Sequence, residues 1–244
     1  PSPETVPKNG IVNKHFSDAR KQICSLGGGN HFIEIQKDTD NYVWIMIHSG
    51  SRNIGLKVAE HYRKLADEFC LKKNQVNLVK QQLSYLPSNS EEAKNYLSEM
   101  KWCINFALEN RKNMLSVVRD IFTNIFKEID FSNTINIAHN YAELEEHFGV
   151  QVYLHRKGAT KAEMGTIGII PGSQGTKSYI VSGRGNPESF KSCSHGAGRI
   201  MSRHQAVKNL NLRKEIEKLD FKGIIHGMKK RSDLDEASGA YKDI

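Results

Sequence analysis

The sequence lacks any apolar stretch long enough to cross a membrane. No run of about 18 consecutive apolar residues occurs in the chain. Residues 1–10 have neither the basic start nor the apolar segment of a secretory leader. These absences favour a cytoplasmic protein and argue against a membrane partner.

Cysteine is scarce and scattered. The four cysteines, Cys24, Cys70, Cys103 and Cys193, form no C-x-x-C pair. Their spacing argues against a zinc ribbon and against the disulfide framework of a small secreted protein. A reducing cytoplasm suits such cysteines.

Three well-known nucleotide-binding motifs are also missing. Lys-x-Asp-Gly, the motif of ligases with a lysine nucleophile, occurs nowhere. The stretch from Gly172 to Ser178 approaches a P-loop, but Thr176 separates its second glycine from the lysine. The glycine pairs at 183–185 and 196–198 lack the third glycine of a dinucleotide-binding turn. The sequence therefore points away from all three classes.

The chain does have an excess of positive charge. Lysine and arginine number 35 against 27 aspartates and glutamates, which gives a formal net charge of +8. Such a field attracts polyanions such as RNA, although many basic proteins bind no nucleic acid. Basic residues inside glycine- and serine-containing motifs are a better guide, and each of them could also be a solvated charge or a surface ion pair. They are Arg52, Arg156, Lys157, Lys161, Arg199 and Arg203.

The first half of the chain predicts a hairpin followed by helices. Residues 31–36 alternate and residues 42–47 form an apolar run, so we expect two paired strands with the second one buried. Residues 56–83 have a helical pattern that ends near Pro87. Ser88 and Glu91 suggest a capping box for a second helix of about 35 residues, whose apolar stripe indicates packing.

The second half is dense in glycine. We expect short strands at 151–154 and 178–181, an amphipathic helix at 213–222 and a polar loop at 229–238. Long polar turns between short strands are typical of places where a backbone approaches a ligand. Residues 1–23 show little periodicity and are predicted to be a tail or the remnant of a preceding segment.

His195 is the candidate nucleophile. It directly precedes a Gly-Ala-Gly turn and Arg199. Small residues let backbone N–H groups approach a phosphate, and the adjacent imidazole could attack the phosphorus. An isolated tetrapeptide of this kind is more often an exposed loop.

Three other histidines are candidate metal ligands. His31, His48 and His139 each lie at the edge of a strand-like segment. Neutral imidazoles bind transition metals such as manganese, zinc or iron. Taken singly, a histidine in such a place is more often a hydrogen-bonded structural group.

Several segments, in this order along the chain, resemble the RtcB family of GTP-dependent RNA ligases. The resemblance begins near residue 24 and implies an α+β fold of the RtcB type. In that fold, mixed sheets carry a long helical insertion, here at about 56–130, and residues 24–244 form one catalytic domain. The matching segments are residues 26–35, 48–52, 139–141, 155–160 with 170–179, 192–203 and 240–244.

The resemblance implies a reaction. His195 would take GMP from GTP and pass it to an RNA 3′-phosphate, which a 5′-hydroxyl end then attacks, as in tRNA splicing or RNA repair. A 2′,3′-cyclic phosphate end would be hydrolysed first. His31, His48 and His139 would hold Mn²⁺, and all these groups would converge on one cleft. The implied partners are RNA, such as tRNA halves or other cleaved RNA, and an archease-like activator.

The resemblance also implies a guanine nucleotide pocket. Glu34 would accept hydrogen bonds from guanine and so select GTP over ATP, whereas without the family it could equally be an exposed strand carboxylate. Arg52 and Arg199 match arginines that hold phosphate or RNA. The positions that match nucleotide contacts are Asn30, Phe32, Glu34, Asn140, Ser173, Ser178, Ala197, Gly198 and Tyr241.

The sequence departs from the family in two places. Family members complete a pair of Mn²⁺ ions with an upstream Asp-x-x-Cys-Gly motif, which is absent here, since Cys24 lacks the matching aspartate. A far C-terminal segment with a guanine-contacting lysine is also missing after Ile244. We therefore expect a chain that is incomplete at both ends, whether cut, split or degenerate. Two alternatives stay open: a noncatalytic remnant that binds RNA or a nucleotide, and a metal-dependent phosphatase of RNA 3′ ends.

Overall fold

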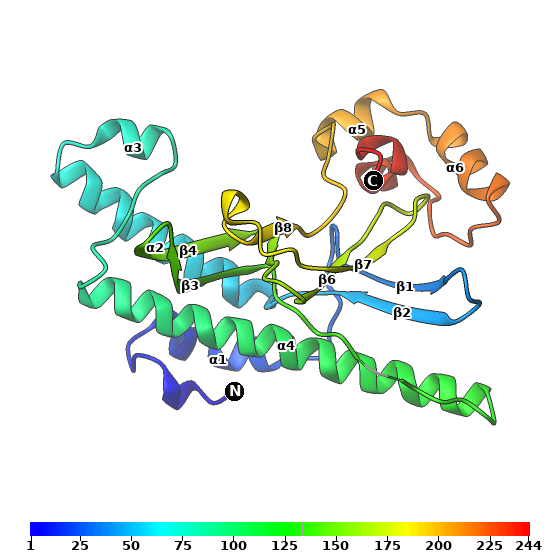
Figure 1. Ribbon diagram of the computed structural model, residues 1–244, viewed down its shortest axis with the longest axis horizontal. Coiled ribbons are helices and arrows are strands. Elements are labelled where there is room, and N and C mark those ends of the chain that lie inside the picture. The colour runs from blue at the N-terminus through cyan, green and yellow to red at the C-terminus, as the bar shows by residue number, and fades with distance from the viewer. Residues whose placement is uncertain (133) are drawn as a thin grey trace. The chain divides into compact units, whose positions relative to one another are not determined.

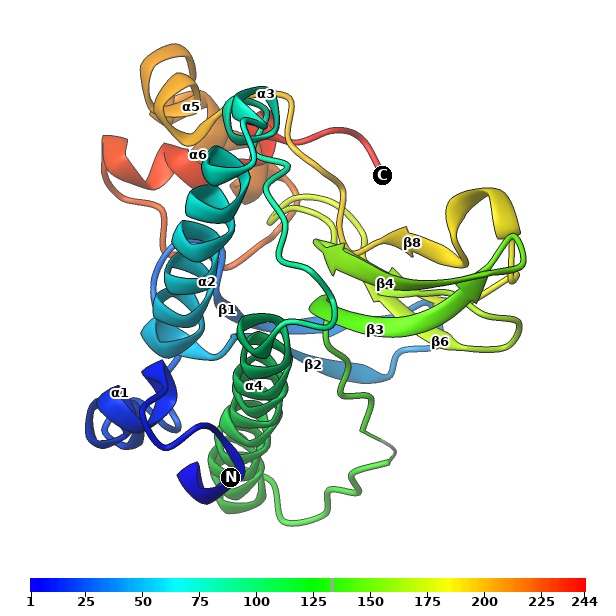
Figure 2. The same ribbon diagram turned by 90° about the vertical axis from the view of Figure 1, so that its left-hand side faces the viewer.

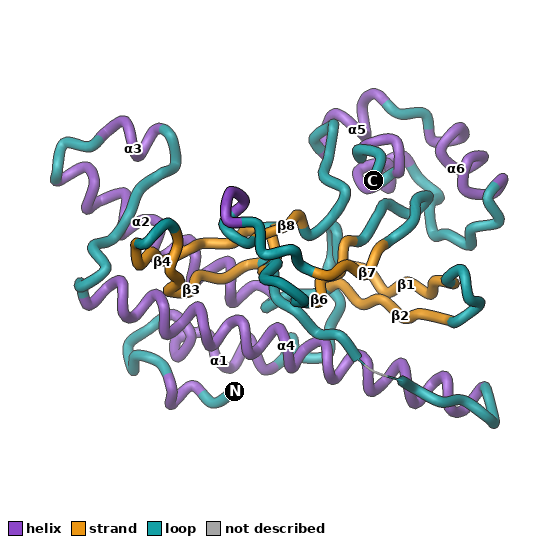
Figure 3. The backbone as a smooth tube through the Cα atoms, viewed as in Figure 1, coloured by secondary structure: helices purple, strands orange, loops and turns teal. Residues whose placement is uncertain are grey.

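The structure, a computed structural model, describes residues 1–132 and 134–244. It divides the chain into two compact units, Pro1–Asn136 and Ile137–Ile244. Figure 1 shows helices together with short strands, and Figure 3 shows how the strands lie in pairs. The predicted α+β class is confirmed at this level.

The first unit is mainly helical. A hairpin in this unit pairs two strands antiparallel, with Phe32 opposite His48. Its elements are the 3-10 turn η1 (Pro3–Thr5), α1 (Ile11–Arg20), β1 (Phe32–Lys37), β2 (Val43–His48), α2 (Arg52–Lys72), α3 (Val76–Lys80) and α4 (Glu91–Ile125).

Helices α1, α2 and α4 pack side by side around the core of this unit (Figure 2). Apolar side chains recur every three or four residues along these helices, so each helix turns one stripe inward. Trp102 stacks on Phe106 at 5.4 Å between ring centroids. The buried cluster consists of Val6, Val12, Ala19, Ile54, Val58, Tyr62, Trp102, Cys103 and Phe106.

A buried carboxylate ties the N-terminal helix into this core. Glu99 of α4 is fully buried and accepts a hydrogen bond from Val12 N at 2.7 Å and another from the Tyr62 hydroxyl at 2.8 Å. Gly10 at the N-cap of α1 offers no capping side chain, so Glu99 satisfies a free N–H group at the start of that helix. Residues 1–23, predicted as a tail or remnant, thus contain a helix with buried Val12 and Ala19.

Two helical predictions need correction in detail. The helix α4 has the predicted 35 residues, but its N-cap is Ser90, whose side chain accepts from Ala93 N, and not Ser88. The helical pattern predicted over 56–83 is divided, because α2 ends at Lys72 and Asn74 takes a left-handed conformation with φ of 57°. Both corrections concern the ends of helices, where several polar residues can serve equally well.

The predicted hairpin is confirmed, but its second strand is not buried. Val43 is 62% exposed and Trp44 is 37% exposed. A continuous apolar run is typical of a buried strand, yet here the sheet has only two strands and covers little surface. The expectation of a buried strand was therefore wrong.

The second unit contains three small antiparallel sheets and a helical segment. The sheets pair β3 with β4, β5 with β8, and β6 with β7. Its elements are β3 (Asn140–His147), β4 (Val150–Lys157), β5 (Ala159–Lys161), β6 (Ile167–Ile170), β7 (Tyr179–Ser182), η2 (Pro187–Ser189), β8 (Ser192–Ser194), α5 (Arg203–Asn209), α6 (Leu212–Phe221), η3 (Arg231–Glu236) and η4 (Ser238–Ala240).

These bounds confirm both predicted short strands and the predicted helix of the second half. The expected loop at 229–238 contains the 3-10 helix η3 instead, because Leu234 and Ala237 turn inward and join a small core with Leu219 and Met228. In the part of the chain that the structure describes, no helix is both long and apolar enough to span a bilayer.

Candidate nucleotide and metal site

The β1–β2 hairpin places several candidate residues on one face. Side chains alternate along a strand, so Phe32 and Glu34 point to the same side. His48 lies directly opposite Phe32 in the register, with 5.5 Å between the two ring centroids. One candidate metal ligand and two candidate nucleotide contacts thus share a surface of the first unit.

The tautomer of His48 is set by its neighbour Asn30. The Nδ1 atom of His48 lies 2.6 Å from the Asn30 carbonyl oxygen, which can only accept a hydrogen bond. His48 Nδ1 therefore carries the proton, and the lone pair of the neutral ring is on Nε2. Histidines that bind metals are commonly anchored in this way by a backbone carbonyl.

His31 is in a different state because Arg52 binds it. An N–H of the Arg52 guanidinium donates to His31 Nδ1 at 3.1 Å, so this ring is neutral with its proton on Nε2. The rings of His31 and His48 lie 5.4 Å apart. A metal ion could bind His31 Nδ1 only if Arg52 left that nitrogen. It could bind Nε2 only if the proton moved from Nε2 to Nδ1, which would also break the Arg52 hydrogen bond.

The glycine-rich segment before β1 makes room for Arg52. A Cβ atom on Gly27 would lie 2.0 Å from the Nη1 atom of Arg52, and Gly27 has a φ of 95°. Arg52 also donates to the Ser25 hydroxyl at 3.2 Å. Glycine at position 27 therefore serves both the turn and the position of the arginine.

Burial perturbs the candidate guanine acceptor. Desolvation raises the pKa of Glu34 above its usual value, and a hydrogen bond from Gln36 Nε2 at 2.9 Å partly opposes this effect. The ionised carboxylate is thus short of donors. A ligand that donates N–H groups to Glu34 would stabilise its charged form.

In the second unit, a turn of small residues holds His195. The ring of His195 lies 4.4 Å from that of His139 between centroids. A Cβ atom on Gly158 would lie only 2.9 Å from His195 Cε1, and Gly158 has a φ of 67°. His195 N donates to the Gly158 carbonyl at 3.3 Å, while Gly158 N donates to the His139 carbonyl at 2.9 Å. The nucleophile candidate and one metal-ligand candidate are thus brought together.

Other candidate residues surround the same turn. The Asn140 side chain accepts from Gly158 N at 2.9 Å, so it braces this turn. Ala197 N donates to the Pro171 carbonyl at 3.2 Å, which joins the histidine turn to the loop at 171–178. Gly198 has a φ of 78° and its carbonyl accepts from Lys242 N.

The loop at 171–178 is organised by its own hydroxyl groups. Ser173 N donates to Thr176 Oγ1 at 2.7 Å, and Gly172 N donates to the Ser178 hydroxyl at 3.1 Å. Ser173 is buried. Both candidate serines therefore lie in a compact turn.

Arg199 is held by an acidic residue that the sequence analysis did not single out. Its guanidinium donates to Glu236 at 3.0 Å and stacks over the Tyr241 ring at 4.8 Å. The Tyr241 hydroxyl also donates to Glu236, and so does Arg203 at 2.7 Å. Burial, assisted by the carboxylate, raises the pKa of Tyr241 to about 12. No motif or spacing marked Glu236, because its role comes from a segment more than thirty residues away from Arg199.

Two of the basic residues that the sequence suggested as phosphate contacts already form ion pairs with carboxylates. Arg156 is buried and donates to Glu145 at 2.5 Å, and it also donates to the Ser192 hydroxyl at 2.9 Å. Lys161 lies within 4.0 Å of three carboxylates. Both residues therefore form ion pairs, which was the alternative to a phosphate contact. Their charges hold neighbouring strands in place.

The donor chemistry suits a metal ion in part. His48 has the tautomer that a metal ligand needs, whereas His31 requires Arg52 to move. Among the described residues, no three His, Cys, Asp or Glu side chains gather closely enough to form a metal-binding group. His31 and His48 belong to the first unit and His139 to the second.

Comparison with known proteins agrees with the resemblance. A family model described as tRNA-splicing ligase RtcB matches residues 4–244. The chain is 41% identical over 230 residues to the RNA-splicing ligase RtcB of Escherichia coli strain K12, which covers 92% of this chain and 55% of that protein. It is 35% identical over 263 residues to the RNA-splicing ligase RtcB homolog 1 of Entamoeba dispar, covering 92% and 48%.

A third relative is archaeal. The chain is 34% identical over 279 residues to the tRNA-splicing ligase RtcB of Thermococcus kodakarensis, covering 99% of this chain and 58% of that protein. The chain spans about half the length of the curated relatives it matches. Since the family model covers nearly all of its residues, the chain belongs to the RtcB family.

Proposed function

We propose that this chain carries the nucleotidyl-transfer part of an RNA ligase that uses GTP. The ligase joins RNA 3′-phosphate or 2′,3′-cyclic phosphate ends to 5′-hydroxyl ends through a guanylyl group on His195. The observation that carries the proposal is the His195 turn, where the imidazole lies against Gly158 and beside His139. The names of the relatives, which describe RNA-splicing ligases, support the same reaction class.

In the first step, a ring nitrogen of His195 attacks the α-phosphorus of GTP. The N–P bond forms as the bond from that phosphorus to the bridging oxygen breaks, and pyrophosphate leaves with the electron pair. The imidazole releases its N–H proton to solvent. Gly158 and Asn140 hold the backbone of the turn, which keeps the ring in position for attack.

The next two steps transfer the guanylyl group and join the ends. An oxygen of the RNA 3′-phosphate attacks the guanylyl phosphorus, the N–P bond breaks, and His195 is restored. The 5′-hydroxyl oxygen of the second RNA then attacks the activated 3′-phosphate, GMP leaves, and the hydroxyl proton is lost. A cyclic phosphate must first add water across one P–O bond.

In this proposal, the residues that match the family's nucleotide contacts recognise GTP. Glu34 accepts from guanine N1–H and N2–H₂, which offsets the burial that raises its pKa. Phe32 offers an aromatic surface next to it. Arg52 and Arg199 neutralise phosphate oxygens, and the ion pair with Glu236 holds the Arg199 guanidinium in its orientation. The remaining predicted contacts are Asn30, Ser173, Ser178, Ala197, Gly198 and Tyr241.

His31, His48 and His139 would hold Mn²⁺, which would stabilise charge on the transferring phosphoryl oxygens. The chain's own contribution is to fix the His48 tautomer through the Asn30 carbonyl. At His31, Arg52 must first give up its hydrogen bond to Nδ1. The released guanidinium is then available to a phosphate oxygen.

Labelling tests the proposal. Incubation of the chain with α-labelled GTP and Mn²⁺ should leave a protein-bound label that is lost in acid and resists hydroxylamine, as a phosphoramidate does. His195→Ala should remove the label. ATP should compete poorly, and Glu34→Gln should narrow the difference between GTP and ATP.

Two other outcomes would redirect the proposal. GTP binding without any label on His195 would indicate a noncatalytic nucleotide-binding remnant. Release of inorganic phosphate from an RNA 3′-phosphate that persists in His195→Ala would indicate a phosphatase. Label that survives His195→Ala would mean that another residue is the nucleophile.

A further inference from the structure

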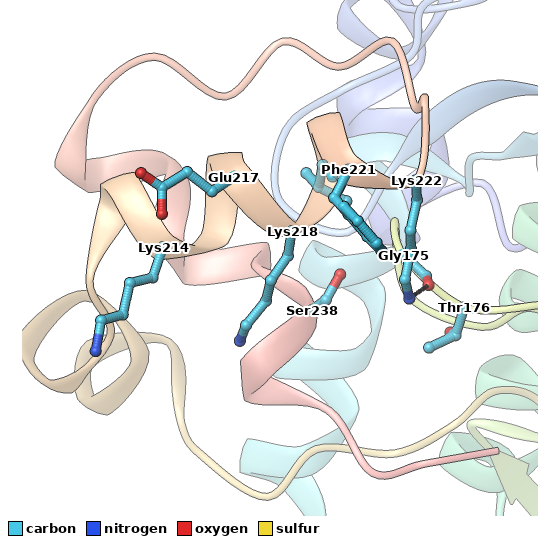
Figure 4. Close-up of a pocket in the computed structure, with 9 residues that line it drawn as sticks. Gly175, Thr176, Lys214, Glu217, Lys218, Phe221, Lys222 and Ser238 are labelled. Carbon is cyan, nitrogen blue, oxygen red and sulfur yellow. Dashed lines mark hydrogen bonds between the residues drawn. The ribbon is translucent and has the colours of Figure 1, made fainter.

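A pocket lies in the second unit, beside helix α6. It has a volume of about 450 Å³, within the range of about 300–1,000 Å³ typical of ligand pockets. Its wall is formed by one side of α6, by the loop at 175–176 and by Ser238 (Figure 4). None of its residues is among the site residues that the family resemblance assigned.

Three lysines of the pocket are spaced four residues apart, two on α6 and the third, Lys222, at its C-cap. Lys214, Lys218 and Lys222 therefore lie on one side of the helix, at intervals of about 6 Å. Figure 4 shows Lys214 and Lys218 leaving the same side of α6. Lysines at this interval along a helix suit an extended chain of negative charges.

The lysines differ in how far their charges are already neutralised. Lys218 lies 2.6 Å from Glu215, so a carboxylate balances its charge. Lys222 donates to the carbonyl of Gly175 at 2.6 Å, which leaves its positive charge unbalanced. Neither Lys214 nor Lys222 has an ion-pair partner within the described ranges. The outer two lysines thus provide net positive charge at both ends of the row.

An exposed aromatic ring lies at the end of the row. Phe221 is the last residue of α6 and lines the pocket, yet 91% of its surface is exposed. The fold gains little from a phenylalanine in this position, because the hydrophobic contribution to stability comes from burial. A nucleic-acid base could stack on such a ring, and a groove that combines aromatic rings with basic residues is the usual design for binding single strands.

A hydroxyl group completes the pocket. Ser238 Oγ is shielded from solvent and has no hydrogen-bond partner among the described residues. A Cβ atom on Gly175 would lie 2.9 Å from this oxygen, so the hydroxyl packs directly against the glycine. A polar ligand in the pocket would satisfy it.

We propose that this pocket binds the backbone and one base of single-stranded RNA. Phe221 stacks with the base, Lys214 and Lys222 contact successive phosphates, and Ser238 donates to or accepts from the sugar–phosphate backbone. The loop connects the pocket to the nucleotide site, because Thr176 lines the pocket while its hydroxyl accepts from Ser173 N. The inference rests on the proposed function for its choice of RNA as the ligand.

Fluorescence anisotropy with a labelled single-stranded RNA carrying a 3′-phosphate tests the pocket. Phe221→Ala should weaken binding by between about fivefold and about 150-fold, the effect of losing one stacked base. The double variant Lys214→Gln/Lys222→Gln should flatten the slope of log K against log salt by about 1.4, since each lost phosphate contact on a single strand removes about 0.7. Ser238→Ala should weaken binding without lowering thermal stability.

Matched controls are available in the same chain. Phe148→Ala removes another exposed phenylalanine, which is 67% exposed. Lys64→Gln/Lys72→Gln removes two exposed lysines that are also eight residues apart on one helix, α2. Neither control should change RNA affinity by as much as its pocket counterpart.

The guanylyl label on His195 separates this inference from the proposed function. The pocket variants should keep the label at the wild-type level while losing RNA affinity. A normal label with unchanged RNA affinity in the pocket variants would overturn the pocket and leave the proposed function standing. A change in oligomeric state in Phe221→Ala with unchanged RNA affinity would assign the ring to protein contact instead. Failure of the wild-type chain both to bind RNA and to take the label would overturn both.

Discussion

At the residue scale, two glycines position the side chains that carry the proposed chemistry. Gly27 leaves space for Arg52, and Gly158 leaves space for His195. In both places a Cβ atom would collide with the side chain, and the backbone has a positive φ. A glycine here determines where its neighbour's functional group lies.

Gly158→Ala should therefore impair guanylylation. The added methyl group would lie 2.9 Å from His195 Cε1 and would displace the ring. A displacement of about 1 Å can cost on the order of 100-fold in rate, so we expect a loss of that order in the labelling rate. Gly149→Ala is the matched control, because Gly149 also has a positive φ but no atom of a described residue lies within 4 Å of its Cβ position. Equal rates in the two variants would contradict this role of Gly158.

Arg52→Ala should strengthen Mn²⁺ binding while it weakens guanylylation. The variant removes both the hydrogen bond that holds His31 Nδ1 and a positive charge beside the candidate ligands. We expect affinity to rise on the order of tenfold. Isothermal titration with Mn²⁺ measures this directly, and His48→Ala should show the opposite change. An Mn²⁺ affinity that falls in Arg52→Ala would mean that the arginine supports the metal site.

At the element scale, single polar side chains fix where helices begin and how strands are held. The start of α4 rests on Ser90, and the β3–β4 hairpin is held to β8 through Arg156, which bridges Glu145 and Ser192. Both kinds of contact are direct hydrogen bonds or ion pairs. Removing either side-chain contact should lower the free energy of unfolding, and only the second loss should depend on pH.

Ser90→Ala should lower the free energy of unfolding by about 1 kcal/mol, the usual cost of losing an N-cap. Its hydroxyl accepts from Ala93 N at 3.1 Å, and that donor would lose its partner. Ser88→Ala, two residues earlier, should have an effect close to zero. Urea denaturation of both variants distinguishes the two candidate caps. The reverse order of effects would restore the cap that the sequence predicted.

Glu145→Gln should destabilise the second unit in a pH-dependent manner. Hydrogen bonds from Arg156 and His147 hold the pKa of Glu145 at about 2, below its ordinary 4.5. A lowered pKa contributes stability that is present above pH 4.5 and is lost as the pH falls toward about 2. The shift corresponds to about 3 kcal/mol. Denaturation at several pH values should show this difference from wild type at pH 7 and its decline in acid, with exposed Glu146→Gln as the control.

At the scale of the whole molecule, the candidate metal ligands are divided between the two units. His31 and His48 lie in the first and His139 in the second. A bridging anionic ligand normally offsets the repulsion between two neighbouring cations, and none was found by motif. We expect weak binding of one Mn²⁺ per chain. Elemental analysis after equilibrium dialysis measures the number, and two tightly bound ions would mean that other side chains complete a pair.

The sequence predicted those parts of the molecule that depend on periodicity. The β1–β2 hairpin and the length of α4 follow from alternation and from three- and four-residue spacing. The N-cap was misplaced because two serines two residues apart offer the same chemistry. The motifs placed His195 beside a glycine turn, but the contacts that hold this turn come from Gly158, Pro171 and Lys242, which are distant in sequence.

The sequence could not predict partners that meet only after folding. Glu99 has no neighbour in sequence that explains its burial, because its donors lie on α1 and α2. Glu236 likewise binds Arg199 and Arg203 from a distant segment. Periodicity and motifs report local preference, whereas these contacts depend on how the chain closes on itself. The Arg52 contact that occupies His31 is hidden for the same reason.

The contacts of α4 with the start of the chain also bear on the timing of synthesis. The hydrogen bond from Val12 to Glu99 spans 87 residues, and the one from the Trp102 indole to the Ser2 carbonyl spans 100. At a translation rate of about 5–20 residues per second, α1 leaves the ribosome at least several seconds before these partners do. During that interval the nascent α1 lacks the carboxylate that accepts from its first turn, so the core of the first unit is completed only when α4 emerges.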